Sequence, residues 1–171
     1  MAPFLVRRAT QSDAAAMARV HTQSWQETYA GLIAPDYLAQ ATTAQAQERR
    51  EQNWYAITAQ NKEAVFVAER GGEVVAFASV GPARDHPGYA YELTTLYSLR
   101  RVQGQGVGQA LLQAVMGQVQ EEGGKTLALW VLSSNPARQW YAAQEAGEKV
   151  RGSLAETRMV WDTLPAGRPT P

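Results

Sequence analysis

The sequence contains no cysteine and only two histidines, His21 and His86, among its 171 residues. Without cysteine the chain has no disulfide scaffold, no thiolate nucleophile and no cysteine-ligated metal site. Two histidines argue against a histidine-rich metal centre, so we expect no metal cofactor. Acidic and basic side chains balance at 16 each, which argues against general nucleic-acid binding but permits a local basic site for one anionic ligand.

Long apolar runs are missing as well. No stretch approaches the ~18 apolar residues of a membrane span, and the N-terminal MAPFLVRRATQSD lacks the apolar segment of a signal peptide. We therefore expect a cytoplasmic protein without a membrane partner. The length is that of one domain, which we place at residues 1–163, with a loose, proline-bearing tail at residues 164–171.

Changes in apolar spacing predict the secondary structure. Thr10 and Asp13 form a capping-box pattern at the start of a first helix, and Gly71-Gly72 is typical of a two-residue hairpin turn. The predicted order is β-α-α-β-β-β-α-β-α-β-β, which indicates one mixed-sheet α/β domain. The expected strands are residues 4–8, 64–69, 73–80, 89–99, 126–132, 148–152 and 157–161, and the expected helices are residues 10–29, 36–59, 107–123 and 136–145.

The most informative segment places Gly104, Gly106 and Gly108 between a strand and an amphipathic helix. Free amides and the dipole at a helix start form a site for an anion such as a pyrophosphate, although a glycine-rich turn without a ligand is the alternative. No Lys-Ser/Thr pair follows these glycines, which excludes a P-loop. A dinucleotide fingerprint fails because Gln109 stands where its third glycine belongs.

The segment Gln103-Gly104-Gln105-Gly106-Val107-Gly108 reads Q-x-x-G-x-G and resembles the acyl-CoA-binding motif of the GNAT superfamily of N-acetyltransferases. The order of elements, the Leu96-Tyr97-Ser98 strand end and a later Asn135 and Tyr141 extend the resemblance over residues 4–162. It implies a single GNAT-like domain with a mixed, mostly antiparallel central sheet flanked by helices. It also implies acetyl-CoA as the co-substrate.

The resemblance assigns coenzyme contacts. The amides of Gln103, Gly104, Gln105, Gly106, Val107 and Gly108 would hold the pyrophosphate. The strand carrying Leu96, Tyr97 and Ser98 would pair with the pantetheine arm. Asn135 would hydrogen-bond this arm or, alternatively, cap the helix after Pro136. Three arginines would neutralise phosphates or, equally, be solvated surface charges: Arg100, Arg101 and Arg138.

Acetyl transfer to an amine requires a base for the amine and an acid for the departing thiolate. Glu92 is the candidate base on the strand, with an ammonium-binding role or a structural ion pair as alternatives. Tyr141 matches the general acid of the family, against a core tyrosine as the alternative reading. Relatives usually read YxxxGF, whereas the glycine here comes only at Gly147, so we expect a longer or differently built turn. A backbone amide near Leu96–Ser98 would stabilise the oxyanion.

The first helix carries candidate acceptor-binding residues. His21, Trp25 and Tyr29 share one helical face. The corresponding region of relatives lines the acceptor pocket, and the alternative is that these side chains pack in the core. His86 lies in a proline-bearing loop and is expected at the surface rather than as a base.

Together these residues predict an acetyl-CoA-dependent N-acetyltransferase that acetylates a primary amine of a small molecule or protein by direct transfer. The alternatives are a non-catalytic acyl-CoA-binding module and, with less support, a dehydrogenase-type nucleotide binder. Pairing of the late strands would allow a homodimer.

Overall fold

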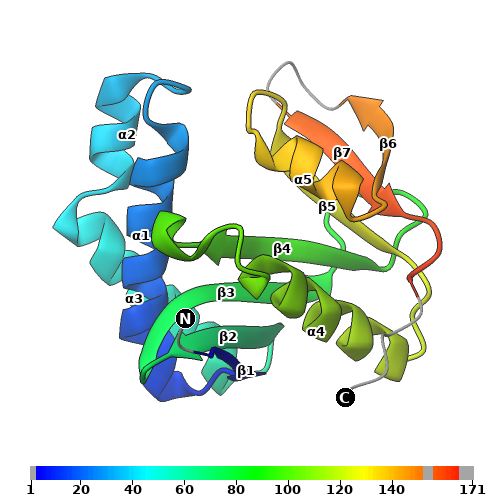
Figure 1. Cartoon of the computed structure of the whole chain (residues 1–171), viewed down its shortest axis with the longest axis horizontal. Helices are drawn as coiled ribbons and strands as arrows, with labels where there is room; N and C mark the ends of the chain where they lie inside the picture. Colours follow the sequence, from blue (N-terminus) through cyan, green and yellow to red (C-terminus); the bar gives the residue numbers. More distant parts are fainter. Residues whose placement is uncertain (1–2, 152–155, 166–171) are drawn as a thin grey trace.

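The computed structural model describes residues 3–151 and 156–165 of the chain (Figure 1). Within these residues one sheet contains β1 (Leu5–Arg8), β2 (Ala64–Arg70), β3 (Glu73–Pro82), β4 (Tyr91–Ser98), β5 (Leu127–Leu132), β6 (Gly147–Arg151) and β7 (Glu156–Trp161). The strand order is β1-β2-β3-β4-β5-β7-β6. Neighbouring strands are antiparallel except β4 and β5, which are parallel. The mixed, mostly antiparallel sheet is therefore confirmed.

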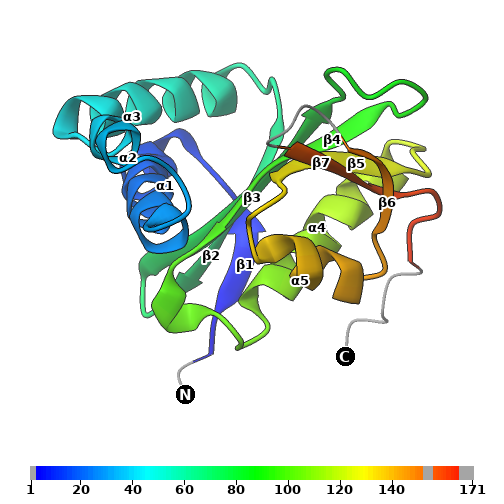
Figure 2. The ribbon, with the colours of Figure 1, turned by 90° about the horizontal axis from the view of Figure 1, so that it is seen from above.

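The helices cover both faces of this sheet. They are α1 (Ala14–Tyr29), α2 (Pro35–Ala41), α3 (Ala44–Ala59), α4 (Val107–Glu121) and α5 (Ala137–Ala143). Figure 2 shows α1, α2 and α3 on one face and α4 and α5 on the other. The single α/β domain with flanking helices is thus confirmed.

The second predicted helix is in fact two helices. The Oγ1 atom of Thr43 accepts a hydrogen bond from the amide of Ala46 at 3.0 Å, so Thr43 caps the start of α3. The Thr42 hydroxyl donates to the Leu38 carbonyl at 2.7 Å at the end of α2. These two threonines divide a region whose composition reads as one continuous helix.

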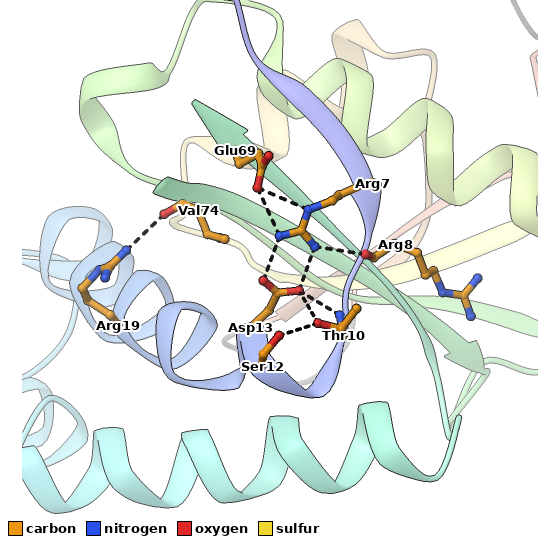
Figure 3. Close-up of polar contacts among 8 residues, drawn as sticks. All are labelled: Arg7, Arg8, Thr10, Ser12, Asp13, Arg19, Glu69 and Val74. Atoms are coloured by element: carbon orange, nitrogen blue, oxygen red, sulfur yellow. Dashed lines mark hydrogen bonds and ion pairs between the residues drawn. The ribbon is translucent and has the colours of Figure 1, made fainter. Parts of the chain in front are cut away.

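The predicted capping box before α1 is part of a larger polar cluster (Figure 3). The Thr10 amide donates to Oδ2 of Asp13 at 2.8 Å. Arg7 of β1 donates to both carboxylate oxygens of Asp13, at 2.8 and 2.9 Å, and also pairs with Glu69 of β2. This guanidinium contact holds the pKa of Asp13 below its usual value. The cluster therefore fixes α1 against the edge of the sheet.

The apolar core includes one residue of the predicted tail. Helix α4 buries Leu111, Val115 and Val119, and α1 buries Met17 and Val20. The core also contains Leu164, which is 8% exposed. Pro165 is also described, whereas residues 166–171 of the predicted tail lie outside the described residues. None of the helices in the described ranges is long and apolar enough to cross a membrane.

Candidate active site

A glycine-bearing loop joins the end of β4 to the start of α4. After a 3₁₀ turn at Arg100–Val102, Gly104 and Gly106 have φ angles of 76° and 85°, in the left-handed region that favours glycine. Gly106 immediately precedes α4, so the first amides of α4 lack partners within the helix. Because the positive end of the helix dipole lies at the same place, the loop is chemically suited to an anion.

Two glutamine side chains hold this loop in place. Gln103 donates from Nε2 to the Ser98 carbonyl at 3.2 Å. Gln105 accepts from Arg70 at 2.7 Å and donates to the Arg101 carbonyl at 3.2 Å. Sequence patterns did not indicate Arg70, because it lies on β2 and only the folded sheet brings it to the loop. With both glutamines engaged, the backbone is the part of the loop left to meet a ligand.

The three arginines proposed as phosphate partners all contact protein groups. Each contact is at least partly exposed, so it is weak and open to replacement by a phosphate. The contacts are the amide and guanidinium of Arg100 with Glu27, Arg101 with Glu73 at 2.9 Å, and Arg138 with Glu148 at 2.7 Å.

A wedge separates β4 from β5. The two parallel strands share a single Cα pair, Glu92 with Ala128, and Figure 1 shows β5 rising away from β4 beyond it. The register between β3 and β4 also shifts between Ser79 and Val80, which leaves Thr94 as an extra residue in β4. The edge of β4 that faces the wedge, up to Ser98, is therefore available to an extended ligand.

Three tyrosines from three elements converge around the wedge. Asn135 donates to the hydroxyl of Tyr29 at 3.3 Å, and the indole of Trp25 donates to the hydroxyl of Tyr97 at 3.2 Å. Burial raises the pKa of Tyr97 to about 12 and also raises the pKa of Tyr29. Burial raises the pKa of Tyr141 as well, with further increases from Tyr97 and Tyr29. All three phenols therefore remain protonated at neutral pH.

The predicted acceptor residues form an aromatic wall on α1. The His21 ring stacks on Tyr97 with centroids 4.5 Å apart, and Trp25 meets Tyr29 edge-on at 4.7 Å. The Trp54 indole donates to Nδ1 of His21 at 3.3 Å. Burial, with a smaller effect of a nearby arginine, lowers the pKa of His21 to about 3. At neutral pH the wall is uncharged.

Helix α5 packs against the start of α4, next to the glycine loop. The side chain of Asn135 accepts from the amide of Ala137, the first residue of α5, at 2.9 Å, and also contacts Tyr29 of α1. A Cβ atom on Gly108 would lie 3.3 Å from the ring of Trp140, so the absence of a side chain permits this close approach. Trp140 precedes Tyr141, and the position of the candidate acid thus depends on α4.

The turn after Tyr141 is differently built rather than longer, which is one of the two alternatives that the sequence left open. The Ala146 amide donates to the Tyr141 carbonyl at 3.1 Å, and the Glu145 amide donates to the Ala142 carbonyl at 3.0 Å. These two bonds define a Schellman turn, with Glu145 at the left-handed position and a φ angle of 69°. Glu145 therefore stands where YxxxGF has glycine, and the hydrogen bonds hold it in a conformation that usually requires glycine.

Glu92 lies at the opposite end of β4 from the glycine loop. Its side chain is buried, and Oε1 accepts from the Arg84 amide at 2.9 Å. The Arg84 guanidinium is 3.5 Å from Oε2, and Nε2 of His86 is 3.4 Å from Oε1. The expectation that His86 lies at the surface is wrong: it is 4% exposed, because the loop between β3 and β4 folds inward over Glu92.

A second carboxylate lies near the middle of β4, at a position that the sequence did not reveal. Glu63 contacts the hydroxyl of Thr94, the extra residue of the strand, and Thr94 in turn contacts Ser79 at 2.6 Å. A Cβ atom on Gly81 would lie 2.8 Å from Cγ of Glu63, so this glycine makes room for the carboxylate. Glu63 stands in a bend before β2, where no motif marks it.

Comparison with known proteins agrees with this architecture. The family model described as "Acetyltransferase (GNAT) family" matches residues 19–147. An uncharacterized N-acetyltransferase of Bacillus subtilis, YuaI, is 34% identical over 140 residues, which are 81% of this chain and 77% of that protein.

Solved structures share the fold. The PaiA N-acetyltransferase of Thermoplasma acidophilum, in complex with coenzyme A, superposes with a TM-score of 0.76 at 18% identity, covering 92% of this chain and 98% of that chain. YncA of Salmonella typhimurium, with its cofactor acetyl-CoA, superposes with a TM-score of 0.71 at 21% identity, covering 98% of this chain and 99% of that chain. Since the family model covers most of the chain and a curated relative exceeds 30% identity, the chain belongs to the GNAT family and is an N-acetyltransferase.

Proposed function

We propose that this N-acetyltransferase uses acetyl-CoA to acetylate a primary amine by direct transfer within a ternary complex. The observation that carries the proposal is the wedge between β4 and β5, which begins at Glu92 and opens toward the free amides around Gly106. Coenzyme A and acetyl-CoA in the structures of two fold neighbours support the same coenzyme here. The chain has no cysteine to carry an acetyl group, which is consistent with direct transfer.

The residues present fit this coenzyme. The backbone amides from Gln103 to Gly108 would bind the pyrophosphate, and the open edge of β4 at Leu96–Ser98 would pair with the pantetheine amides like an added strand. The side chain of Asn135, at the start of α5, would hydrogen-bond the same arm. When bound, the coenzyme supplies an acetyl thioester, whose carbon is the electrophile.

Tyr141 is proposed as the general acid. As the amine nitrogen forms its bond to the acetyl carbon, the carbon–sulfur bond breaks and the sulfur takes a proton. Burial keeps the Tyr141 phenol protonated, with its pKa above the ordinary value, so the proton is available at any physiological pH. Its hydroxyl comes from α5, which the contact between Trp140 and Gly108 ties to the coenzyme loop.

We propose that Glu92 contacts the ammonium group of the acceptor, either as the base that removes its proton or as the carboxylate that binds it. An alkylamine with a pKa near ~10.4 is less than about 0.1% unprotonated at pH 7, so removal of its proton needs an acceptor. The Arg84 amide holds one carboxylate oxygen of Glu92 through a 2.9 Å hydrogen bond, and Nε2 of His86 lies 3.4 Å from the same oxygen. Among the ion pairs of the described residues, the other oxygen faces only the exposed Arg84 guanidinium.

The acceptor would lie between this carboxylate and the aromatic wall of α1. The rings of His21, Trp25 and Tyr29 carry no charge at neutral pH. Burial and the Arg50 guanidinium, 5.7 Å from the Trp25 ring centroid, favour the uncharged amine over the ammonium ion here. We therefore propose that these side chains bind the body of the acceptor, while the charged end approaches Glu92.

The test is a panel of primary amines assayed for release of free coenzyme A thiol, with acetyl-CoA binding measured by calorimetry. We expect Tyr141→Phe to lower kcat about 100-fold and Glu92→Gln to lower turnover, both with acetyl-CoA Kd within twofold of wild type. Tyr55→Phe, at an exposed tyrosine of α3, is the matched control and should change neither quantity. Coenzyme binding without turnover of any amine would refute the proposal, as would a fully active Tyr141→Phe variant.

A further inference from the structure

His86 lies in the loop between β3 and β4 and is enclosed by side chains of β4, β5 and β7. Its imidazole stacks on Trp130 of β5, with centroids 4.9 Å apart and planes at 28°. Arg158 of β7 lies over the same Trp130 ring at 4.5 Å and donates from Nε to Nδ1 of His86 at 3.0 Å. A second Arg158 nitrogen donates to the Asp85 carbonyl at 2.7 Å, which fixes the loop that carries His86.

These contacts determine the tautomer of the ring. A guanidinium group can only donate, so Nδ1 of His86 must accept and the proton of the neutral ring resides on Nε2. That nitrogen is buried and makes no hydrogen bond within the described residues, yet it lies 3.4 Å from Oε1 of Glu92. A small rotation of either side chain closes this gap to hydrogen-bond distance.

Burial, more than the surrounding charges, favours the neutral ring of His86. Burial lowers its pKa, and Arg158 and Arg84 lower it further, whereas Glu92 and Asp85 raise it. The net direction is downward. The imidazole is therefore neutral at pH 7, and its one N–H nitrogen lies 3.4 Å from the carboxylate.

We propose that His86 is a positioning residue for Glu92: it presents a fixed Nε2–H group that, with the Arg84 amide, holds the carboxylate facing the acceptor. The inference rests on the proposed role of Glu92 at the acceptor. The remaining partner, the Arg84 guanidinium, is 3.5 Å away on a side chain that is 76% exposed. Such a contact is weak, and the acceptor's ammonium group can take its place.

Two substitutions of His86 separate its hydrogen bond from its packing. His86→Phe keeps a ring against Trp130 but removes the N–H donor, and His86→Gln supplies a side-chain amide donor in a similar position. We expect His86→Phe to lower kcat about tenfold with acetyl-CoA Kd within twofold, and His86→Gln to recover at least half of the lost kcat. Tyr89→Phe is the matched control, because it removes a hydrogen bond to Asp162 from the same loop without touching Glu92.

Either of two kinetic results would overturn the inference. One is a His86→Phe variant with wild-type kcat. The other is an equal loss in Tyr89→Phe, which would assign the effect to the stability of the loop.

Nitrogen NMR tests the tautomer without any turnover. The chain has only two histidines, so the imidazole spectrum is simple, and His86→Phe identifies the His86 signals. We expect a neutral ring protonated at Nε2 at pH 7; an imidazolium or an Nδ1–H ring would refute the proposal. Arg158→Met removes the donor and one positive charge, so the pKa of His86 should rise and the variant should lose kcat as the pH falls below 7. That loss should disappear in the double variant with His86→Phe.

The two proposals fail in different ways. If no amine releases coenzyme A thiol with the wild-type protein, the proposed function fails, while the tautomer measurement still decides how His86 faces Glu92. If turnover depends on Glu92 but not on His86, only the present inference fails.

Discussion

Replacing Gly106 with alanine isolates the contribution of the loop backbone to coenzyme binding. The φ angle of Gly106 is 85°, and an added Cβ would meet no atom within 4 Å, so alanine introduces backbone strain without a clash. Holding an L residue in the left-handed region costs about 1–2 kcal/mol. We expect the free energy of unfolding to fall by about that amount. If the loop instead relaxes toward negative φ, the amides before α4 turn away, and a loss of 1.4 kcal/mol raises the acetyl-CoA Kd about tenfold.

Gly117→Ala provides the control within the same helix. Gly117 lies on the exposed side of α4, and a Cβ there also meets nothing within 4 Å, but its φ angle is not positive. Alanine in a helix interior is favoured over glycine by about 1 kcal/mol. The two sites are about 16 Å apart along the helix, so their effects on stability should add, and the double variant should unfold near the wild-type urea midpoint.

Urea unfolding and calorimetric titration with acetyl-CoA then separate stability from binding. We expect the double variant to regain stability but to keep the raised Kd. A double variant with wild-type affinity would show that Gly106→Ala acts through stability alone. An unchanged Kd in a Gly106→Ala variant whose urea midpoint is also unchanged, so that the loop has relaxed without strain, would refute the assignment of the pyrophosphate to these amides.

Three further predictions follow from single side chains. Because burial lowers the pKa of His21 to about 3, the folded state opposes its protonation below the ordinary value of 6.5. Stability from this group is complete above pH 6.5 and falls as the pH drops, by about 2 kcal/mol between pH 8 and 5, and His21→Gln should flatten that part of the urea-midpoint profile. Glu145→Gly should raise the free energy of unfolding by about 1 kcal/mol, since a φ angle of 69° strains glutamate; an unchanged urea midpoint would contradict this. Gly108→Ala should displace Trp140 and lower kcat several-fold through Tyr141, and kcat equal to wild type would show that this contact is dispensable.

The glycine loop could be predicted from the sequence because its chemistry depends on local spacing. Alternating glycines before an amphipathic stripe indicate positive φ angles and free helix amides, and the structure has both at Gly104 and Gly106. The aromatic face of α1 follows from helical periodicity in the same way. The succession of strands along the chain and the single α/β domain follow from the succession of apolar patterns.

The surroundings of Glu92 were beyond such reasoning, because they depend on distant parts of the chain. A loop containing proline and charged residues reads as exposed, yet His86 is buried by Trp130 and by Arg158, which is 72 residues away along the sequence. The sequence could not decide between the two alternatives for the turn after Tyr141, for another reason. Pattern rules place glycine at the left-handed position, while the paired hydrogen bonds of the turn hold Glu145 there.

The distribution of charge along β4 suggests how a protonated acceptor would be handled. At one end Glu92 is a buried carboxylate, whereas the wall around Tyr97 contains a neutral His21 and protonated phenols. An ammonium group is stabilised beside the carboxylate and destabilised by burial against the wall. Moving from the carboxylate to the wall therefore lowers the pKa of the amine and favours loss of its proton.

A quaternary analogue of an accepted amine, which has no proton to lose, separates the two roles of Glu92. We expect it to inhibit competitively against the amine. If Glu92 binds the ammonium, Glu92→Gln should raise the inhibition constant about tenfold; if Glu92 acts only as the base, the constant should stay the same while kcat falls. A Glu92→Gln variant with both quantities unchanged would remove Glu92 from the acceptor site. The wall alone would then have to select the uncharged amine, and the rate should follow the small unprotonated fraction of the free amine as the pH rises.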